Sequence, residues 1–157
     1  MRYLYSDVFS NFLRKDSEAI FGELVDNYHG EIIGTTKEAW KGEIVLLKKV
    51  LIPWSSEKAQ VVFEYNIPRL GKRIDVVLLL RGLIFCLEFK VGQKVALQAD
   101  VEQVMDYALD LKKFHLFSHD KKIIPILIPT QHQSSTTEFK PSVYDDGIYN
   151  PLISGEE

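Results

Sequence analysis

The stretch RIDVVLLLRGLIFCLEFK, residues 73–90, contains two apolar runs, 76–80 and 83–87, separated by Arg81-Gly82. Short apolar runs on either side of a turn are typical of central β-strands joined in a hairpin. Strands that are apolar on both faces require helices above and below the sheet. The stretch therefore predicts the centre of an α/β sandwich.

The sequence on both sides of this hairpin extends the pattern. Residues 6–28 predict one or two short helices, and residues 37–51 predict a longer amphipathic helix. A β-rich segment, 59–67, leads into the hairpin, and residues 97–115 predict a second amphipathic helix. The apolar segment 121–130 predicts one more buried strand. The expected order is therefore helix, strand, strand, strand, helix, strand, an α/β arrangement.

Composition divides the chain into three parts. Residues 1–34 are expected to form a helical extension that packs on a core made by residues 35–131. After Thr130 the sequence becomes polar and rich in turn residues, so residues 132–157 are expected to form a tail or linker. Pro125 lies inside the last apolar segment and indicates a sheet edge or a bulge, because proline has no N–H to donate to a neighbouring strand.

The chain has 157 residues, of which 46% are hydrophobic and 26% charged, values that are ordinary for one globular domain. Its apolar runs are too short to cross a bilayer, and its N-terminus has no apolar signal-peptide region, so we expect a cytoplasmic protein without membrane contact. Cys86 is the single cysteine, which excludes an internal disulfide and a zinc site built of cysteines. Its apolar neighbours predict a buried thiol.

The distribution of charge is uneven along the chain. The net charge of −3 argues against a protein that coats nucleic acid with its whole surface. Residues 69–94, however, carry a local charge of +4. The basic residues in this range are Arg69, Lys72, Arg73, Arg81, Lys90 and Lys94, against the acidic Asp75 and Glu88. Two interpretations remain open, a surface that faces anions such as phosphate or a solvated charged rim.

Three ionisable residues stand at the ends of the two predicted strands. In an antiparallel hairpin, residues equidistant from the turn lie opposite each other, which brings Asp75 close to Glu88. Lys90 is two residues from Glu88 and points to the same face. Carboxylates this close favour Mg²⁺ or Mn²⁺, and Lys90 is placed to activate a water or to stabilise charge on phosphorus. The pattern suits phosphodiester hydrolysis; the alternative is solvated strand ends with a weak ion pair.

The spacing of these residues resembles that of a known superfamily. "RID", twelve residues and "EFK" are similar to the PD-(D/E)XK nuclease motif, in which an Asp is followed by (D/E)-X-K at the end of the next strand. The predicted element order over residues 37–130 is similar to that superfamily's core. The resemblance implies a restriction-endonuclease-like α-β-β-β-α-β fold, with a mixed central sheet flanked by helices and extra N-terminal helices. Ile74 replaces the nominal Pro of the motif.

The resemblance also implies a metal centre. Asp75 and Glu88 would hold Mg²⁺ or Mn²⁺, and Lys90 would assist the attacking water. The first core helix of the superfamily often carries a Glu that faces the metal, and Glu43 in "AWKGEI" is placed for that role. Glu64, on the strand before the hairpin, ranks below Glu43 as a further candidate.

A QxxxY pattern, common in the superfamily on the helix after the (D/E)XK strand, is supplied here by "QVMDY". Gln103 and Tyr107 are four residues apart, share a helix face and would position the substrate or Lys90. The alternative for this pair is an ordinary polar stripe. The basic residues expected to contact the DNA backbone are Arg69, Lys72, Arg73 and Lys94.

Longer stretches narrow the resemblance. "FEYNIPRLGKRIDVVLLLRGLIFCLEFKVG" and "VMDYALDLKKFH" resemble the N-terminal region of a bacterial family of larger proteins, in which a PD-(D/E)XK-like domain precedes a helicase or ATPase domain. The implied partners are DNA and a C-terminal ATPase or helicase domain in a longer chain. A homodimer is a further expectation, because many such nucleases pair to cut both strands.

Two other functions fit the same residues. A non-catalytic docking module with a nuclease fold would bind nucleic acid without Mg²⁺ or Mn²⁺ and never cut it. An enzyme could instead use these carboxylates on a phosphoester that is not nucleic acid; a strong salt dependence of DNA affinity argues against that alternative.

Overall fold

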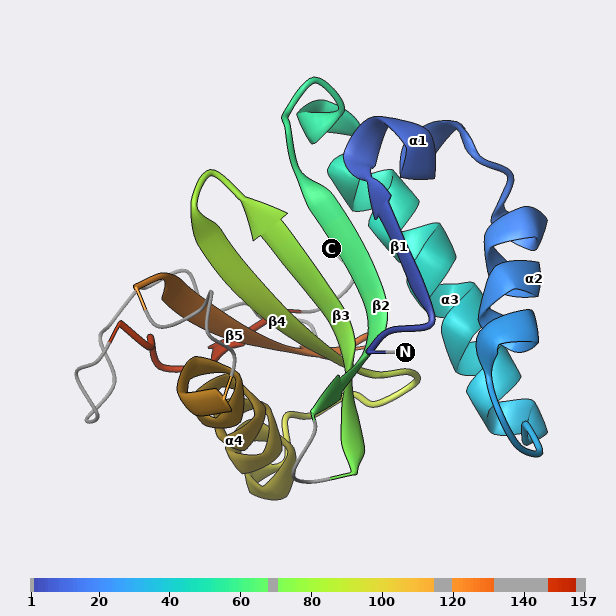
Figure 1. The fold of residues 1–157 in the computed structure, drawn as a ribbon. Coiled ribbons are helices and arrows are strands. Elements are labelled where there is room, and N and C mark those ends of the chain that lie inside the picture. Colours follow the sequence, from blue (N-terminus) through green and yellow to red (C-terminus); the bar gives the residue numbers. More distant parts are fainter. Residues whose placement is uncertain (1, 68–70, 115–119, 132–146, 155–157) are drawn as a thin grey trace.

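The computed structural model describes residues 2–67, 71–114, 120–131 and 147–154. Its centre is a mixed six-stranded sheet with the strand order β1-β2-β3-β4-β5-β6 (Figure 1). The strands are β1 (Tyr5–Val8), β2 (Gln60–Ile67), β3 (Lys72–Leu80), β4 (Leu83–Lys90), β5 (Lys122–Pro129) and β6 (Leu152–Ile153). The helices are α1 (Phe9–Arg14), α2 (Ser17–Asn27), α3 (Gly34–Leu51), the short 3-10 helix η1 (Ile52–Trp54) and α4 (Gln98–Phe114).

The predicted hairpin forms the middle of this sheet. Strands β3 and β4 pair antiparallel from Leu80–Leu83 onward, and the turn residues Arg81 and Gly82 both have positive φ angles, 52° and 76°. A two-residue turn of this kind matches the twist of the strands that it joins. Strand β4 then pairs in parallel with β5, and α4 supplies the crossover that parallel neighbours require. The predicted order of helix, three strands, helix and strand is confirmed by α3, β2, β3, β4, α4 and β5.

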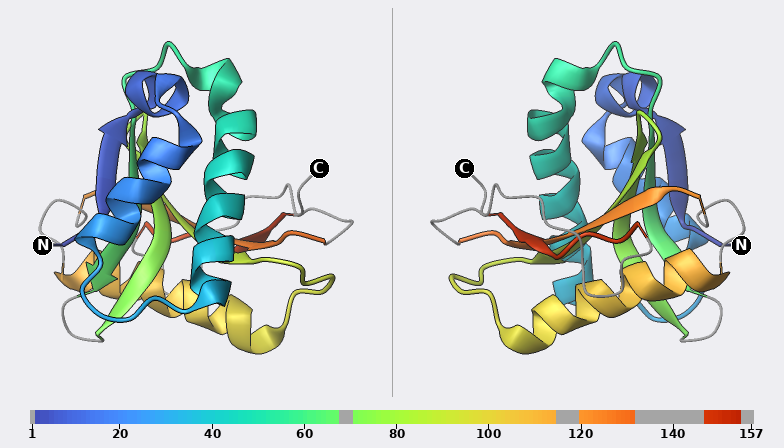
Figure 2. Two further views of the ribbon diagram at one scale, coloured as in Figure 1. Left: turned by 90° about the vertical axis from the view of Figure 1, so that its right-hand side faces the viewer. Right: turned by 90° about the vertical axis from the view of Figure 1, so that its left-hand side faces the viewer.

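Helices cover both faces of the sheet, as the two apolar runs of the hairpin predict. Figures 1 and 2 show α1, α2 and α3 together on one side of the molecule and α4 apart from them. One core joins α1–α3 to the sheet through side chains such as Phe12, Ile44 and Phe63. The other joins α4 to the sheet and contains Ala108 and Cys86, the latter fully buried as expected. Among the described helices, none combines the length and apolar character needed to cross a membrane.

The N-terminal part of the chain differs from the prediction. Residues 5–8 form strand β1, which pairs antiparallel with β2, although the sequence pattern predicts helices over residues 6–28. The Tyr5 ring is buried against Phe63, with ring centroids 5.9 Å apart. Pairing with β2 satisfies backbone groups at an open sheet edge, and this tertiary gain overrides local pattern. The expected helical extension therefore contains a strand as well as α1 and α2.

The C-terminal part also returns to the sheet. Strand β6 pairs in parallel with β5, and Ile148 and Leu152 are buried. Residues 147–154 are thus part of the fold, whereas residues 132–157 were expected to be a polar tail; residues 132–146 and 155–157 lie outside the described ranges. Pro125 does not lie on an edge strand, because β5 has neighbours on both sides. On the β6 side, Ile123 bridges to Ile148 and the ladder resumes only at Ile126 and Leu127, so the pairing is interrupted at Pro125, whose nitrogen has no hydrogen to donate.

Candidate functional site

The site begins where β3 and β4 separate. Their ladder extends from Leu80–Leu83 to Val76–Leu87. Directly beyond it, Asp75 Oδ2 accepts a hydrogen bond of 2.8 Å from the Phe89 backbone N–H. The predicted proximity of Asp75 to the end of β4 is therefore confirmed, and this carboxylate is fastened to the main chain between the other two residues of the motif.

Glu88 lies next to Asp75 and is buried, with only 4% of its surface exposed to solvent. Burial raises the pKa of Glu88 to about 11, and a hydrogen bond to the Asp75 carboxyl and the negative charge of Asp75 add to the shift, while Lys90 opposes it. The site thus crowds carboxyl groups that would repel each other if all were ionised, and a cation between them would relieve that repulsion.

Glu43 reaches the same place from α3. The residue is 3% exposed, and its Oε2 atom is buried without a hydrogen-bond partner. Burial raises its pKa well above the ordinary range, and the charges of Asp75 and Glu64 add to the effect. Buried carboxylate oxygens without partners are rare, because the lost hydration is costly. An unpartnered carboxylate oxygen at this position is suited to coordinate a cation.

Glu64 lies closer to the centre of the site than is expected for a candidate ranked below Glu43. The β2–β3 register pairs Phe63 with Val76 and Tyr65 with Ile74, so Glu64 lies opposite Asp75. The Trp40 Nε1–H donates a 3.0 Å hydrogen bond to Glu64 Oε1. Burial raises the pKa of Glu64 to about 7, with Asp75 raising it further and the Trp40 hydrogen bond opposing the shift.

Helix α4 supplies a chain of hydrogen bonds to Lys90. Lys90 Nζ donates to Gln103 Oε1 at 3.2 Å, and Gln103 Nε2 donates to the Tyr107 hydroxyl at 2.8 Å. Gln103 of the predicted QxxxY pair therefore contacts Lys90, and Tyr107 contacts Gln103. Asp100 Oδ1 is 3.6 Å from Lys90 Nζ and was not foreseen. Its position three residues before Gln103, on the same helix face, was the available signal.

These side chains line one cavity of about 380 Å³. All six residues predicted as catalytic border it: Glu43, Asp75, Glu88, Lys90, Gln103 and Tyr107. The cavity is also bordered by Glu64, Trp40 and Arg73. The wall consists of the first core helix, three strands and the crossover helix, so residues from 43 to 107 in the sequence meet at one point.

The basic residues expected to contact DNA are not all at this cavity. Arg73 borders it and lies over the Tyr28 ring, 5.0 Å from the centroid. Lys72 is exposed and borders an adjoining cavity of about 700 Å³ along α4, to which Lys90 also belongs. Lys94 is exposed on the connection between β4 and α4, and Arg69 lies outside the described residues.

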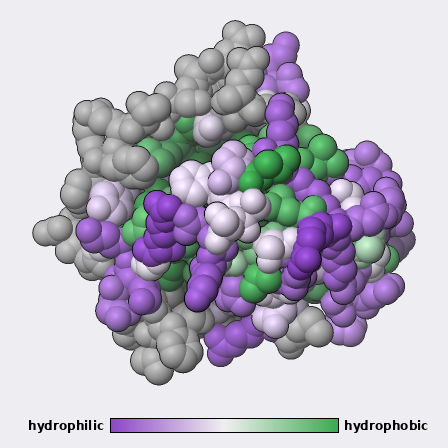
Figure 3. Space-filling model, turned by 90° about the horizontal axis from the view of Figure 1, so that it is seen from above, coloured by the Kyte–Doolittle hydropathy of each residue, from purple (hydrophilic) through white to green (hydrophobic). Residues whose placement is uncertain are grey.

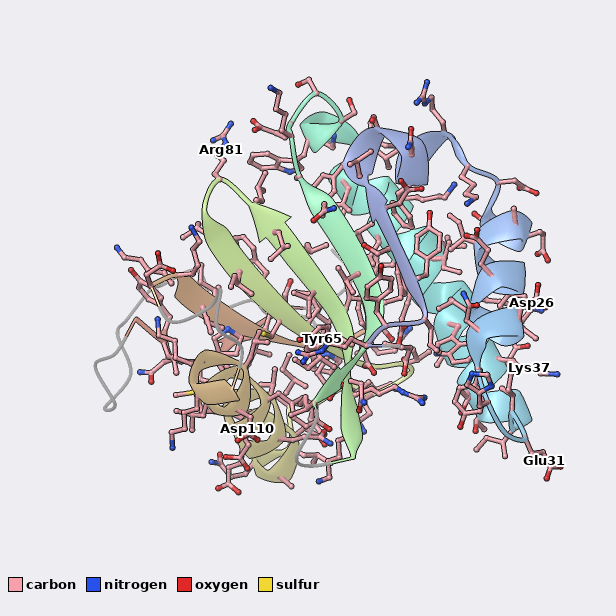
Figure 4. The ribbon with its side chains drawn as sticks, in the orientation of Figure 1. Asp26, Glu31, Lys37, Tyr65, Arg81 and Asp110 are labelled. Atoms are coloured by element: carbon pink, nitrogen blue, oxygen red, sulfur yellow. The ribbon has the colours of Figure 1, made fainter. Side chains whose placement is uncertain are left out.

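Arg81 belongs to the other end of the sheet. It lies at the tip of the β3–β4 hairpin, points away from the ribbon (Figure 4) and is bonded to Glu57. The local charge of +4 counted over residues 69–94 therefore does not form one continuous surface.

Two other cavities differ in character from this one. A cavity of about 320 Å³ on the α4 side is bordered mainly by apolar side chains such as Val77 and Leu111. A cavity of about 280 Å³ between α3 and the sheet is bordered almost entirely by apolar residues, including Leu46 and Phe85. Figure 3, seen from above, shows hydrophobic surface interrupted by hydrophilic side chains. Neither apolar cavity has converging carboxylates, so the cavity at Asp75 is the candidate for chemistry.

The fit of a divalent cation depends on pairs of carboxylates. Among residues in the described ranges, no group of three or more His, Cys, Asp or Glu side chains is placed to hold a metal ion. Mg²⁺ is usually held by one or two carboxylates together with waters and substrate phosphate. The oxygen-rich donor set and the unpartnered Glu43 Oε2 fit such an ion.

Comparison with known proteins identifies no relative of this chain. No protein-family model, curated protein or solved structure matches the chain. The α/β architecture alone does not specify an activity, since one fold hosts many functions.

Proposed function

We propose that this domain is a metal-dependent nuclease of the PD-(D/E)XK type, with a restriction-endonuclease-like core, that hydrolyses DNA phosphodiester bonds. The observation that carries the proposal is the convergence of Asp75, Glu88 and Lys90 in one cavity, with Lys90 held by Gln103. Two carboxylates beside an ammonium group meet the needs of phosphodiester hydrolysis, which requires a bound cation and a positioned water.

Asp75 and Glu88 would hold Mg²⁺ or Mn²⁺, with Glu43 contributing directly or through water. The ion would supply Lewis-acid stabilisation of the negative charge that develops on the phosphate. Asp75 is held in place by the Phe89 N–H, so its carboxylate is oriented before any ligand arrives. Burial of Glu88 and Glu43 excludes bulk water from the ligands and strengthens their interaction with a cation.

Lys90 would orient the water that attacks phosphorus. Its ammonium group is hydrogen-bonded to Gln103, and Gln103 is hydrogen-bonded in turn to Tyr107. These bonds hold the Lys90 ammonium at the cavity. In the reaction the water oxygen forms a bond to phosphorus, one phosphorus–oxygen ester bond breaks, and the leaving oxygen takes up a proton. No oxidant or reductant is needed.

The substrate and partners follow from the same proposal. Arg73 would contact a phosphate at the cavity, and Lys72, Lys94 and Arg69 would contact the adjoining backbone. We also propose that the protein acts in the cytoplasm and that a C-terminal ATPase or helicase domain follows it in a longer chain. Two copies would pair where both DNA strands are cut. The support for these is the resemblance of the quoted stretches.

Cleavage of labelled DNA in Mg²⁺ tests the proposal. Glu88→Gln and Lys90→Ala are expected to lower the rate at least about 100-fold, the usual size of such losses. Lys37→Ala is the matched control, because Lys37 is an exposed lysine on α3 that does not border the cavity. Equal cleavage by parent and both site variants would show that any activity comes from elsewhere.

A docking module is the second candidate. The observation in its favour is that the Asp75 and Glu88 carboxyls are hydrogen-bonded to each other, while Asp75 also accepts the Phe89 N–H. In that arrangement a proton rather than a cation separates the two charges. Such a module would bind DNA equally well in Mg²⁺ and in a chelator, and would leave it intact in both.

A further inference from the structure

The connection between β4 and α4, residues 91–97, exposes several large apolar side chains. Val91, Val95 and Leu97 are 51%, 58% and 48% exposed. Single exposed apolar residues are ordinary on a protein surface, whereas several in one short segment point to a binding partner. Both views of Figure 2 show this connection, in yellow, projecting from the margin of the molecule.

The backbone of this connection is fastened at both ends. The Gly92 N–H donates a hydrogen bond of 2.8 Å to Thr130 Oγ1, just beyond the end of β5. At the other end, the Leu97 carbonyl accepts a 3.0 Å hydrogen bond from the Asp100 N–H in the first turn of α4. The apolar side chains are therefore carried by an ordered backbone, so that little conformational freedom is lost when they bind.

The connection begins directly after Lys90, at the cavity that holds the proposed nuclease site. Val95 is five residues further along the chain and therefore at most about 17 Å from Lys90. Successive nucleotides of one DNA strand are about 3.4 Å apart along the duplex. A strand with one phosphate at Lys90 thus has its neighbouring nucleotides within reach of the connection. Lys94, exposed in the same segment, adds positive charge that attracts the DNA backbone.

The size of the apolar group distinguishes among partners. A stable protein–protein interface buries about 800 Å² on each partner, far more than three side chains supply. Stacked nucleobases, in contrast, accept single apolar side chains, which enter between two base steps and partly unstack them.

We infer that the 91–97 connection is a wedge that inserts Val95 and Leu97 between nucleobases next to the phosphate that is cleaved. This inference rests on the proposed function and names the substrate class, which is duplex DNA with a step that is readily unstacked. A mismatched pair is such a step, because less pairing and stacking energy is lost when it opens.

Two substitutions remove the apolar surface of the wedge. Val95→Ser and Leu97→Ser replace exposed side chains, and serine at position 97 is compatible with the start of α4, since it is a favoured helix-capping residue. Val45→Ser is the matched control, because Val45 is an equally accessible valine, 61% exposed, on α3. Thermal unfolding of the three variants is expected to match that of the parent.

The test uses duplexes that contain 2-aminopurine, a nucleobase whose fluorescence rises when it unstacks, placed in a matched duplex or beside a mismatch. Phosphorothioate linkages keep these duplexes intact, so that binding is measured both in EDTA and in Mg²⁺. The parent and Val45→Ser are expected to raise the fluorescence and to prefer the mismatched duplex. Val95→Ser and Leu97→Ser should lose most of the rise and bind that duplex about tenfold more weakly, the effect of one Val or Leu side chain left unburied.

The inference is overturned if the parent leaves the fluorescence unchanged under both conditions, or if both wedge variants raise it as the parent does. Cleavage of unmodified duplex in Mg²⁺ separates this result from the proposed function. A fluorescence rise without cleavage would reject the nuclease but not the wedge. Cleavage without a fluorescence rise would reject the wedge but not the nuclease.

Discussion

The Asp75 carboxylate on β3 accepts a 2.8 Å hydrogen bond from the backbone N–H of Phe89 on β4. Phe89 stands between Glu88 and Lys90, so this bond ties the Asp75 carboxylate to the segment of β4 that carries the other two residues of the motif. The two strands separate at this point, and the separation opens the cavity that the carboxylates border.

This bond predicts a difference between two substitutions of the same residue. Asp75→Ala and Asp75→Asn both remove the charge, but only Asn retains an oxygen that accepts the Phe89 N–H. Asp75→Ala leaves a buried donor unpaired, so we expect it to be less stable than Asp75→Asn by about 1–3 kcal/mol. Urea unfolding of the two variants measures the difference. Equal stabilities would show that the bond contributes nothing to the fold.

The crowded carboxyls predict a pH dependence of stability in the presence of a chelator. Glu88 has its pKa raised from 4.5 to about 11 by burial and by Asp75, so the folded chain holds this proton at pH values where the unfolded chain has lost it. Stability therefore falls as pH rises above 4.5. Glu88→Gln removes this effect.

The stability gained by Glu88→Gln over the parent should grow by more than about 1.4 kcal/mol, the free energy of one pKa unit, between pH 5 and pH 8. Thermal unfolding at the two pH values, with EDTA in both samples, gives this comparison. A gain that stays constant with pH would mean that Glu88 titrates normally in the fold.

The contact between Lys90 and Gln103 predicts a kinetic effect. Gln103→Ala removes the acceptor of Lys90 and the donor to Tyr107, so Lys90 loses its fixed direction. We expect kcat for DNA cleavage to fall about tenfold or more, with a smaller change in KM. Gln98→Ala, an exposed glutamine on the same helix, is the control. A raised KM with an unchanged kcat would instead assign Gln103 to substrate binding.

The return of residues 147–154 to the sheet predicts that they contribute to stability. Ile148 is 1% exposed and packs in the core on the α4 side. Ile148→Ala should lower the free energy of unfolding by about 2–5 kcal/mol, whereas Asn150→Ala, at an exposed neighbour, should change it little. Calorimetric or urea-induced unfolding measures both changes. If Ile148→Ala leaves the free energy of unfolding unchanged, this segment is the linker that its composition suggests.

The central hairpin was predictable because its information is local. Two apolar runs and a turn lie within 73–90, and the helices before and after it have clear apolar periodicity. Strands β1 and β6 have four and two residues and exist through pairing with β2 and β5, partners distant in the sequence. Short segments of this kind have no pattern of their own, so the sequence could not identify them.

The site was predictable to a similar degree and for similar reasons. The proximity of Asp75, Glu88 and Lys90 follows from hairpin pairing. Gln103 and Tyr107 were implied by the resemblance through its QxxxY pattern, and their four-residue spacing places both on one helix face. Glu64 was only a lower-ranked candidate in the sequence, because its place in the site depends on a positive φ angle and on a hydrogen bond from Trp40 of another element.

The central claim is that Asp75 and Glu88 hold a divalent cation, and calorimetric titration of Mg²⁺ into the parent and into Asp75→Asn tests it most directly. The titration is made without and with an oligonucleotide, because substrate phosphate can supply a ligand. We predict binding to the parent that is lost or strongly weakened in Asp75→Asn, which retains the bond to Phe89. No binding to the parent under either condition, or equal binding to both proteins, would contradict the claim.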